Sequence, residues 1–116
     1  MRDQPVPEVG HADVERVLAR DYPPAARPEA RQRLGDLPDE CGPRTRLAVL
    51  KLAQGDLARL AEAVAVAQRD WRDVIAAAEY PVDALLPVSA TASAHEVAYE
   101  ADWQQYQVWL HAQASA

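Results

Sequence analysis

The fold of this chain is set by residues 44–81, which read RTRLAVLKLAQGDLARLAEAVAVAQRDWRDVIAAAEYP. The first part of this stretch is apolar nearly all round a helix, with Lys51 as the one charge in its middle. This pattern predicts a mostly buried central helix. Gly55 is placed to end that helix in a left-handed conformation, and Asp56 to cap the next one. Because so few residues separate the two helices, we expect them to pack as an angled or antiparallel pair.

Apolar residues continue beyond Asp56 at alternating steps of three and four residues, the period of an amphipathic helix. This stripe keeps its phase through Trp71, so we expect the indole to fill the core. Two interpretations of the backbone stay open: one continuous helix from Asp56 to Glu79, or a break near Asp70. We favour the break, because Asp70 can cap a new helix with Asp73 as an anion in its first turn. The stripe consists of Leu57, Leu60, Val64, Ala67, Trp71, Val74 and Ala78.

The rest of the chain is also helical in character. No run of β-branched and aromatic residues alternates with polar ones, and strong helix formers dominate. Helices are expected over residues 12–21 and 28–34, and a loop over 35–43. The sequence therefore predicts an all-α fold, a compact bundle of four or five short helices with an additional C-terminal amphipathic helix.

A single domain is expected from a chain of 116 residues. Its last helix should begin at Ser93, because Ser93 and Glu96 have the spacing of a capping box. The predicted parts are a flexible N-terminal lead over residues 1–10, a helical domain over 11–81, a linker over 82–92, and an acidic, aromatic helix over 93–113.

The formal net charge of −6 lies entirely beyond Arg72, because residues 1–72 hold all 12 basic residues and 12 of the 18 acidic ones. An acidic C-terminal part repels nucleic-acid phosphates and favours a basic protein partner, so nucleic-acid binding is not favoured. No stretch reaches the roughly 20 apolar residues of a membrane span. The N-terminus lacks an apolar signal region, and a lone Cys41 forms no internal disulfide. We therefore expect a cytoplasmic protein that does not enter membranes.

The usual chemical signatures are missing. His11, His95 and His111 stand far apart and have no metal-ligand spacing to a cysteine or carboxylate. Cys41 follows two carboxylates, which oppose formation of a reactive thiolate. The glycines are scattered, so no phosphate-binding loop is formed. We expect no metal and no cofactor, and nothing in the pattern supports catalysis.

The last helix carries the best candidate surface for a protein partner. An aromatic stripe at helical spacing either packs on the protein's own helices or docks onto a second subunit or another protein. The second interpretation makes this a non-catalytic interaction or regulatory module, and a homodimer is one form of it. The candidate residues are Tyr99, Trp103, Tyr106 and Leu110 on the stripe, Trp109 beside it, and Glu96, Glu100 and Asp102 on other faces.

Two alternative functions are kept. One is a small enzyme or enzyme subunit, with a site around Trp71 built from Arg69, Asp70, Arg72 and Asp73. The other is an acidic DNA mimic or antitoxin-like inhibitor. The mimic requires the carboxylates of the last helix to form an exposed row.

Residues 44–81 resemble a segment found in a group of small bacterial helical proteins to which no function is assigned. In that group a pattern similar to LAxLKLAxGDLxxL…DYRDVLAWAEYP follows an upstream DYP, which stands here at residues 21–23. Trp71 takes a position that is usually aromatic in the group. The resemblance covers about a third of the chain. It implies an all-helical fold and a bacterial, cytosolic protein, and it implies no activity. The helix after Pro81 departs from the pattern and looks like an extension.

Overall fold

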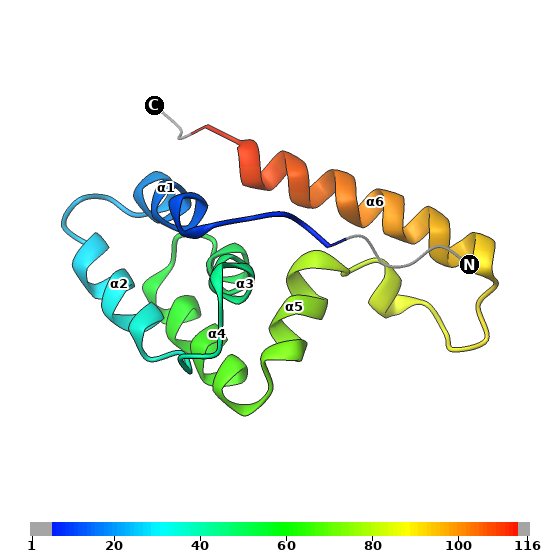
Figure 1. The fold of residues 1–116 in the computed structure, drawn as a ribbon, viewed down its shortest axis with the longest axis horizontal. Coiled ribbons are helices and arrows are strands. Elements are labelled where there is room, and N and C mark those ends of the chain that lie inside the picture. The colour runs from blue at the N-terminus through cyan, green and yellow to red at the C-terminus, as the bar shows by residue number, and fades with distance from the viewer. Residues whose placement is uncertain (1–5, 114–116) are drawn as a thin grey trace.

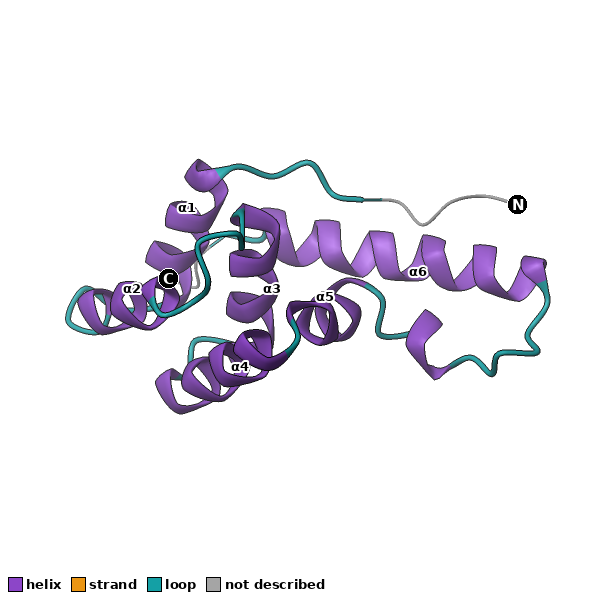
Figure 2. Ribbon diagram, turned by 60° about the horizontal axis from the view of Figure 1, so that its bottom comes forward, coloured by secondary structure: helices purple, strands orange, loops and turns teal. Residues whose placement is uncertain are grey.

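The computed structural model describes residues 6–113. This part of the chain contains six α-helices, one short 3₁₀ turn and no strand, which confirms the predicted all-α bundle of four or five short helices with an additional C-terminal helix. Figure 1 shows α6 lying across one side of the five-helix bundle, and Figure 2 shows its N-terminal end extending beyond it. The elements are α1 (His11–Asp21), α2 (Arg27–Gly35), α3 (Pro43–Ala53), α4 (Leu57–Arg69), α5 (Trp71–Glu79), the 3₁₀ turn η1 (Asp83–Leu85) and α6 (Ala92–His111).

The centre of the bundle is α3, which packs against α1, α4 and α5. Leu47 and Leu50 are fully buried, and Lys51 is half-buried at the edge of the helix. This confirms the prediction of a central helix that is apolar nearly all round. Because so much of its surface is covered, α3 contributes more buried residues than any other helix described, and their burial stabilises the bundle.

The short junction between α3 and α4 contains the left-handed glycine and the aspartate cap that the sequence predicts. Gln54 and Gly55 both adopt left-handed backbone angles, with φ of 52° and 77°. A Cβ on Gly55 would lie 2.8 Å from the carbonyl oxygen of Asp21, so this position also needs glycine for space. The Asp56 carboxylate then accepts hydrogen bonds from the backbone N–H groups of Ala58 and Arg59 at 2.8 and 3.0 Å, which confirms the predicted cap.

The helical stripe is broken at Asp70, as favoured from the sequence. α4 ends at Arg69, Asp70 is extended, and its carboxylate accepts a hydrogen bond from the N–H of Arg72 at 3.0 Å to cap α5. The expectation that Trp71 fills the core is wrong, since the side chain is 45% exposed. Because Asp70 is extended, α5 does not continue the helical turn of α4. The three-and-four spacing of apolar residues along α4 therefore does not predict which side of α5 its first residue, Trp71, occupies.

The C-terminal part begins differently from the prediction. The hydroxyl of Thr91 accepts a hydrogen bond from the N–H of Ala94 at 3.1 Å, so Thr91 caps α6 and Ser93 lies inside the helix. The predicted capping box at Ser93 is therefore wrong, because an equally good cap precedes it by two residues. The predicted linker also contains the turn η1.

The predicted N-terminal lead lies partly outside the described residues, which begin at Val6. The segment from Val6 to Gly10 is irregular and runs alongside the bundle to the start of α1. Pro7 is buried and lines a small cavity with Glu79, Tyr80 and the two aromatic residues Trp103 and Tyr106 of α6.

Candidate interaction surfaces

The aromatic stripe of α6 faces the protein's own bundle. Tyr106 and Leu110 are each 2% exposed, and Tyr99, Trp103 and Trp109 are half-buried. The rings of Tyr106 and Trp109 lie 5.5 Å apart. Two interpretations of the stripe were open, packing within the chain and docking onto a partner. In the structure these side chains pack within the chain.

Two arginines of α1 hold the C-terminal end of α6. Arg16 donates from Nη1 to the carbonyl oxygen of Leu110 at 2.8 Å, and Arg20 donates to those of Trp109 and Ala112 at 2.7 and 3.0 Å. The Arg20 guanidinium also lies 5.2 Å from the centre of the Trp109 ring. The last carbonyls of a helix lack partners within it and carry partial negative charge, so these contacts satisfy them and stabilise the helix end.

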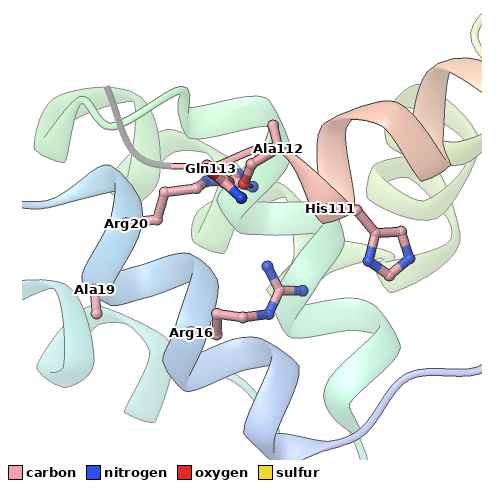
Figure 3. Close-up of a pocket in the computed structure, with 6 residues that line it drawn as sticks. All are labelled: Arg16, Ala19, Arg20, His111, Ala112 and Gln113. Atoms are coloured by element: carbon pink, nitrogen blue, oxygen red, sulfur yellow. Dashed lines mark hydrogen bonds between the residues drawn. The ribbon is translucent and has the colours of Figure 1, made fainter. Parts of the chain in front are cut away.

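A hollow of about 520 Å³ lies between α1 and this helix end (Figure 3). Arg16 and His111 both border it, and the Arg16 side chain remains 42% exposed despite its hydrogen bond to α6. The remaining lining residues are Ala19, Arg20, Ala112 and Gln113. The C-terminal end of α6 is therefore bordered by basic groups that are contributed by another element.

Asp102 fastens the middle of α6 to the segment before it. Its carboxylate is 1% exposed and accepts hydrogen bonds from the backbone N–H groups of Val82 and Asp83 at 2.9 and 3.0 Å. Burial lowers the pKa of Lys51 on α3, and the charge of Asp102 acts in the opposite direction. Nearby, Nδ1 of His95 lies 2.6 Å from a carboxylate oxygen of Asp83. The sequence does not indicate this buried role of Asp102, because it lies in the same acidic stretch as Glu96 and Glu100.

The burial of Asp102 argues against the DNA-mimic hypothesis. That hypothesis needs Glu96, Glu100 and Asp102 to form an exposed row, and only Glu96 and Glu100 are exposed. Two acidic side chains on one helix do not reproduce the regular phosphate spacing of DNA. The structure therefore gives this alternative no support.

The outward side of α6 carries apolar residues that nothing in residues 6–113 covers. Val97 is 71% exposed and Val108 is 69% exposed. At about 3.6 residues per turn, these two valines lie on one side of the helix, opposite the buried Tyr106. We call this side the outer face of α6 and define it by Val97, Ala101, Gln104 and Val108, all of which are exposed.

Exposed apolar side chains are concentrated in this part of the molecule. Of the seven large hydrophobic residues that are exposed in the described chain, five lie between residues 82 and 108. Leu85 and Val88 of the segment before α6 are 87% and 103% exposed, respectively. The helical spacing of Val97 and Val108 in the sequence could have predicted the outer face. The aromatic stripe is larger and was the more obvious candidate surface.

A second concave site lies beside Trp71. The cleft has a volume of about 360 Å³, and Trp71 and Arg72 are the only two of the five candidate enzyme residues that line it. Arg72 is ion-paired with Asp70 at 3.0 Å, and Arg69 and Asp73 are exposed elsewhere. The other lining residues are Arg44, Ile75, Ala76, Tyr80, Asp83 and Ala84.

Arg44, one of the residues that line this cleft, forms an ion pair with Glu79 that was not predicted from the sequence. Arg44 donates from Nη2 and Nε to the two carboxylate oxygens of Glu79 at 2.8 and 2.9 Å, and Glu79 is 3% exposed. These hydrogen bonds raise the pKa of Arg44, and burial raises the pKa of Tyr80, whose hydroxyl accepts from Arg44 at 3.3 Å. Bidentate pairing of a buried carboxylate locks α3 to α5.

The remaining chemical groups give no further site. Burial, followed by the charge of Glu40, raises the pKa of the buried Cys41 thiol, which opposes reactivity. Among residues 6–113, no three histidine, cysteine or carboxylate side chains gather as a metal site would require. No helix in the same range is long and apolar enough to cross a membrane.

Comparisons with known protein families, with curated proteins and with solved structures find no match to this chain. The resemblance of residues 44–81 to the bacterial group stays a prediction.

Proposed function

We propose that this protein is a non-catalytic interaction module that contacts a partner protein through the outer face of α6. The observation that carries the proposal is the exposure of Val97 and Val108 on a helix whose opposite side is already buried. Apolar side chains grouped on one side of an anchored helix form a surface that gains free energy when a partner covers it.

The attachment of α6 supports this role. Arg16 and Arg20 bind its C-terminal carbonyls, and the buried Asp102 joins its middle to the preceding segment. A helix held at several points presents its outer face with little loss of conformational entropy on binding. An anchored helix is thus a better docking element than a free one.

The exposed charges favour a partner that is basic near the contact. Glu96 and Glu100 flank the outer face, and the chain beyond Arg72 contains no lysine or arginine. Charge complementarity of this kind increases the association rate and selects against acidic partners. Because residues 44–81 resemble a segment of the bacterial group, the proposal places this interaction in the cytoplasm.

The test is capture of partners from the native host with a double variant, Val97→Glu and Val108→Glu. Introducing two charges should abolish capture while the circular dichroism spectrum and the melting temperature stay close to those of the wild type. Ala65→Glu is the matched control, because Ala65 is exposed on α4, away from α6. Retention of every partner by the double variant would exclude this face as the contact.

The cleft beside Trp71 is a second candidate, as a site for a small ligand. It brings an exposed indole together with the guanidinium groups of Arg44 and Arg72, a combination that suits a ligand with an apolar body and a carboxylate or phosphate. A thermal-shift screen of such compounds against wild type and Trp71→Ala tests it. Compounds that stabilise both proteins equally would count against this site.

A further inference from the structure

We infer that Pro7 occupies a slot that binds an extended, proline-containing segment of another protein, so that the N-terminal segment acts as a displaceable strap. The strap is defined as residues 6–10, and it extends from α1 along the bundle beside α6 (Figure 1). The slot lies between the end of α5 and the side of α6 that faces the bundle. It is therefore separate from the outer face of α6, and the inference goes beyond the proposed function.

The slot is built from aromatic side chains of two elements. Tyr80 directly follows α5, and Trp103 and Tyr106 stand three residues apart on α6, where side chains are neighbours. Together with Glu79 they line a cavity against which the buried Pro7 lies. The space left in this cavity is about 10 Å³, which is room for about one water molecule. The proline ring therefore packs closely against the aromatic residues.

The chemistry of the slot suits proline in particular. A proline has no backbone N–H group, so its burial among aromatic rings leaves no backbone donor without a partner. Segments that contain proline also favour the extended polyproline II conformation, which reduces the entropy lost on docking. Aromatic-lined grooves are a recurrent binding site for such segments. The residue that the protein itself places in the slot thus indicates the class of ligand.

The hydroxyl group of Tyr106 offers a contact that the strap does not use. The side chain is 2% exposed and lines the cavity, and its hydroxyl has no hydrogen-bond partner among the described residues. A buried hydroxyl without a partner is unfavourable. A backbone carbonyl oxygen of another segment, placed beside this hydroxyl, would accept its hydrogen bond. A partner segment that supplies this acceptor therefore has an advantage over the strap.

Apolar packing holds the strap in place. Pro7 is buried in the slot and Val9 packs against the core, whereas Val6 and Glu8 are exposed. Within residues 6–113, no hydrogen bond or ion pair attaches residues 6–9 to the bundle. Segments with so few contacts open at a small cost in free energy. Because the strap is covalently attached, it competes with an outside segment at an effective concentration of roughly millimolar.

The first experiment measures binding of the acetylated peptide VPEVG, the sequence of residues 6–10, by the NMR signal of the Trp103 indole N–H. In the full chain, Pro7→Gly vacates the slot and should bind this peptide about three- to tenfold more tightly than the wild type, in which the strap competes. Glu8→Gly is the matched control, because it places the same residue at an exposed position of the strap. It should bind the peptide as the wild type does.

The peptide VAEVG, with alanine in place of the proline, should shift the Trp103 signal much less than VPEVG does. Circular dichroism and thermal melting establish that each variant is folded. The inference is overturned by a folded Pro7→Gly variant that does not respond to VPEVG up to millimolar concentration, or that responds equally to VAEVG. Equal binding by the wild type and Pro7→Gly would overturn the strap. Self-association of the wild type that Pro7→Gly abolishes would assign the slot to the strap of a second copy and overturn the partner protein.

The second experiment tests the Tyr106 hydroxyl with a library of short peptides that share a central proline, selected for binding to Pro7→Gly. Adding Tyr106→Phe should weaken the selected peptides by about three- to tenfold, because they supply the acceptor for the hydroxyl. The peptide VPEVG should bind both proteins alike, since the strap leaves this hydroxyl without a partner. Selected peptides that bind both proteins equally would remove the reason for a partner to displace the strap.

The outcomes for the two proposals separate. Neither peptide experiment changes Val97 or Val108, so a failure of peptide binding counts against the slot alone. Retention of every captured partner by the double variant Val97→Glu and Val108→Glu counts against the outer face alone.

Discussion

Trp71 shows how one extended residue changes the environment of its neighbour. The indole follows Asp70, which caps α5, and it is 45% exposed beside the cleft. Core positions in α5 are filled by Val74, Ile75 and Ala78 instead. We therefore expect the indole of Trp71 to add exposed aromatic surface beside the cleft and to contribute little to the free energy of unfolding.

The first prediction compares Trp71→Ala with Leu50→Ala. Leu50 is 0% exposed, so its truncation leaves a cavity and should lower the free energy of unfolding by about 2–5 kcal/mol. Removal of the half-exposed indole should cost about 1 kcal/mol or less. Urea denaturation of both variants measures the two values. A larger loss for Trp71→Ala than for Leu50→Ala would contradict the exposed position of the indole.

The second prediction concerns the hydroxyl group of Tyr22. The side chain is 1% exposed, and its hydroxyl has no hydrogen-bond partner among the described residues. An unsatisfied buried polar group costs about 1–3 kcal/mol, so Tyr22→Phe should raise the free energy of unfolding by about 1 kcal/mol. Chemical denaturation at pH 7 measures the change. A loss of stability would show that the hydroxyl has a partner, such as an ordered water molecule.

At the scale of elements, α6 is held by hydrogen bonds to backbone groups as well as by apolar packing. Its C-terminal carbonyls accept from Arg16 and Arg20, while its Asp102 accepts from the backbone before η1. Both kinds of contact join α6 to segments that are distant in sequence. These polar contacts act together with the packing of Tyr106 and Leu110 in the core, and both leave the outer face of α6 exposed.

The third prediction is that Asp102→Asn loosens this part of the molecule. The amide oxygen of asparagine can replace one acceptor, but its NH₂ group would face the other backbone N–H. We expect a loss of about 2–4 kcal/mol in the free energy of unfolding, because two charge-assisted hydrogen bonds of a buried carboxylate are disrupted. Hydrogen exchange should accelerate in residues 82–91. Glu100→Gln, an exposed change on the same helix, should stay within about 0.5 kcal/mol of the wild type.

At the scale of the whole molecule, buried tyrosines set the response to alkali. Burial raises the pKa of Tyr22 from 10 to about 12, and it also raises the pKa values of Tyr80 and Tyr106. A group whose folded pKa is raised contributes stability that is complete below its unfolded pKa and is lost as pH rises through the folded value. Lys51, whose pKa is lowered by burial, acts in the opposite sense, but it is one group against three.

The fourth prediction is therefore a loss of stability between pH 10 and about pH 12. Each unit of difference in pKa corresponds to about 1.4 kcal/mol, and the tyrosine contributions accumulate in this window. Urea denaturation from pH 8 to pH 12 measures the decline. Tyr22→Phe should decline less steeply than the wild type, since it lacks one of the ionising groups. Parallel curves for the two proteins would show that Tyr22 does not contribute.

The features predictable from the sequence are those that depend on neighbours along the chain. The buried centre at α3 follows from its composition, and the caps at Asp56 and Asp70 follow from side chains that bond backbone groups two or three residues away. The class of fold also follows, because helical periodicity repeats in nearly every segment. Thr91 and Ser93 are equally good caps two residues apart, so local chemistry alone does not determine which of them begins α6.

The functional surface depended on contacts between distant segments. The sequence held the aromatic stripe and the acidic residues of α6, but it did not show that Tyr106 and Asp102 would be buried, or that the face carrying Val97 would remain outside. In the folded chain Tyr106 packs into the core and Asp102 binds the backbone at Val82, so the opposite side of α6 is the one left exposed. The physical reason is that an amphipathic pattern specifies which residues share a side of a helix, whereas only the partners available in three dimensions determine which side is covered.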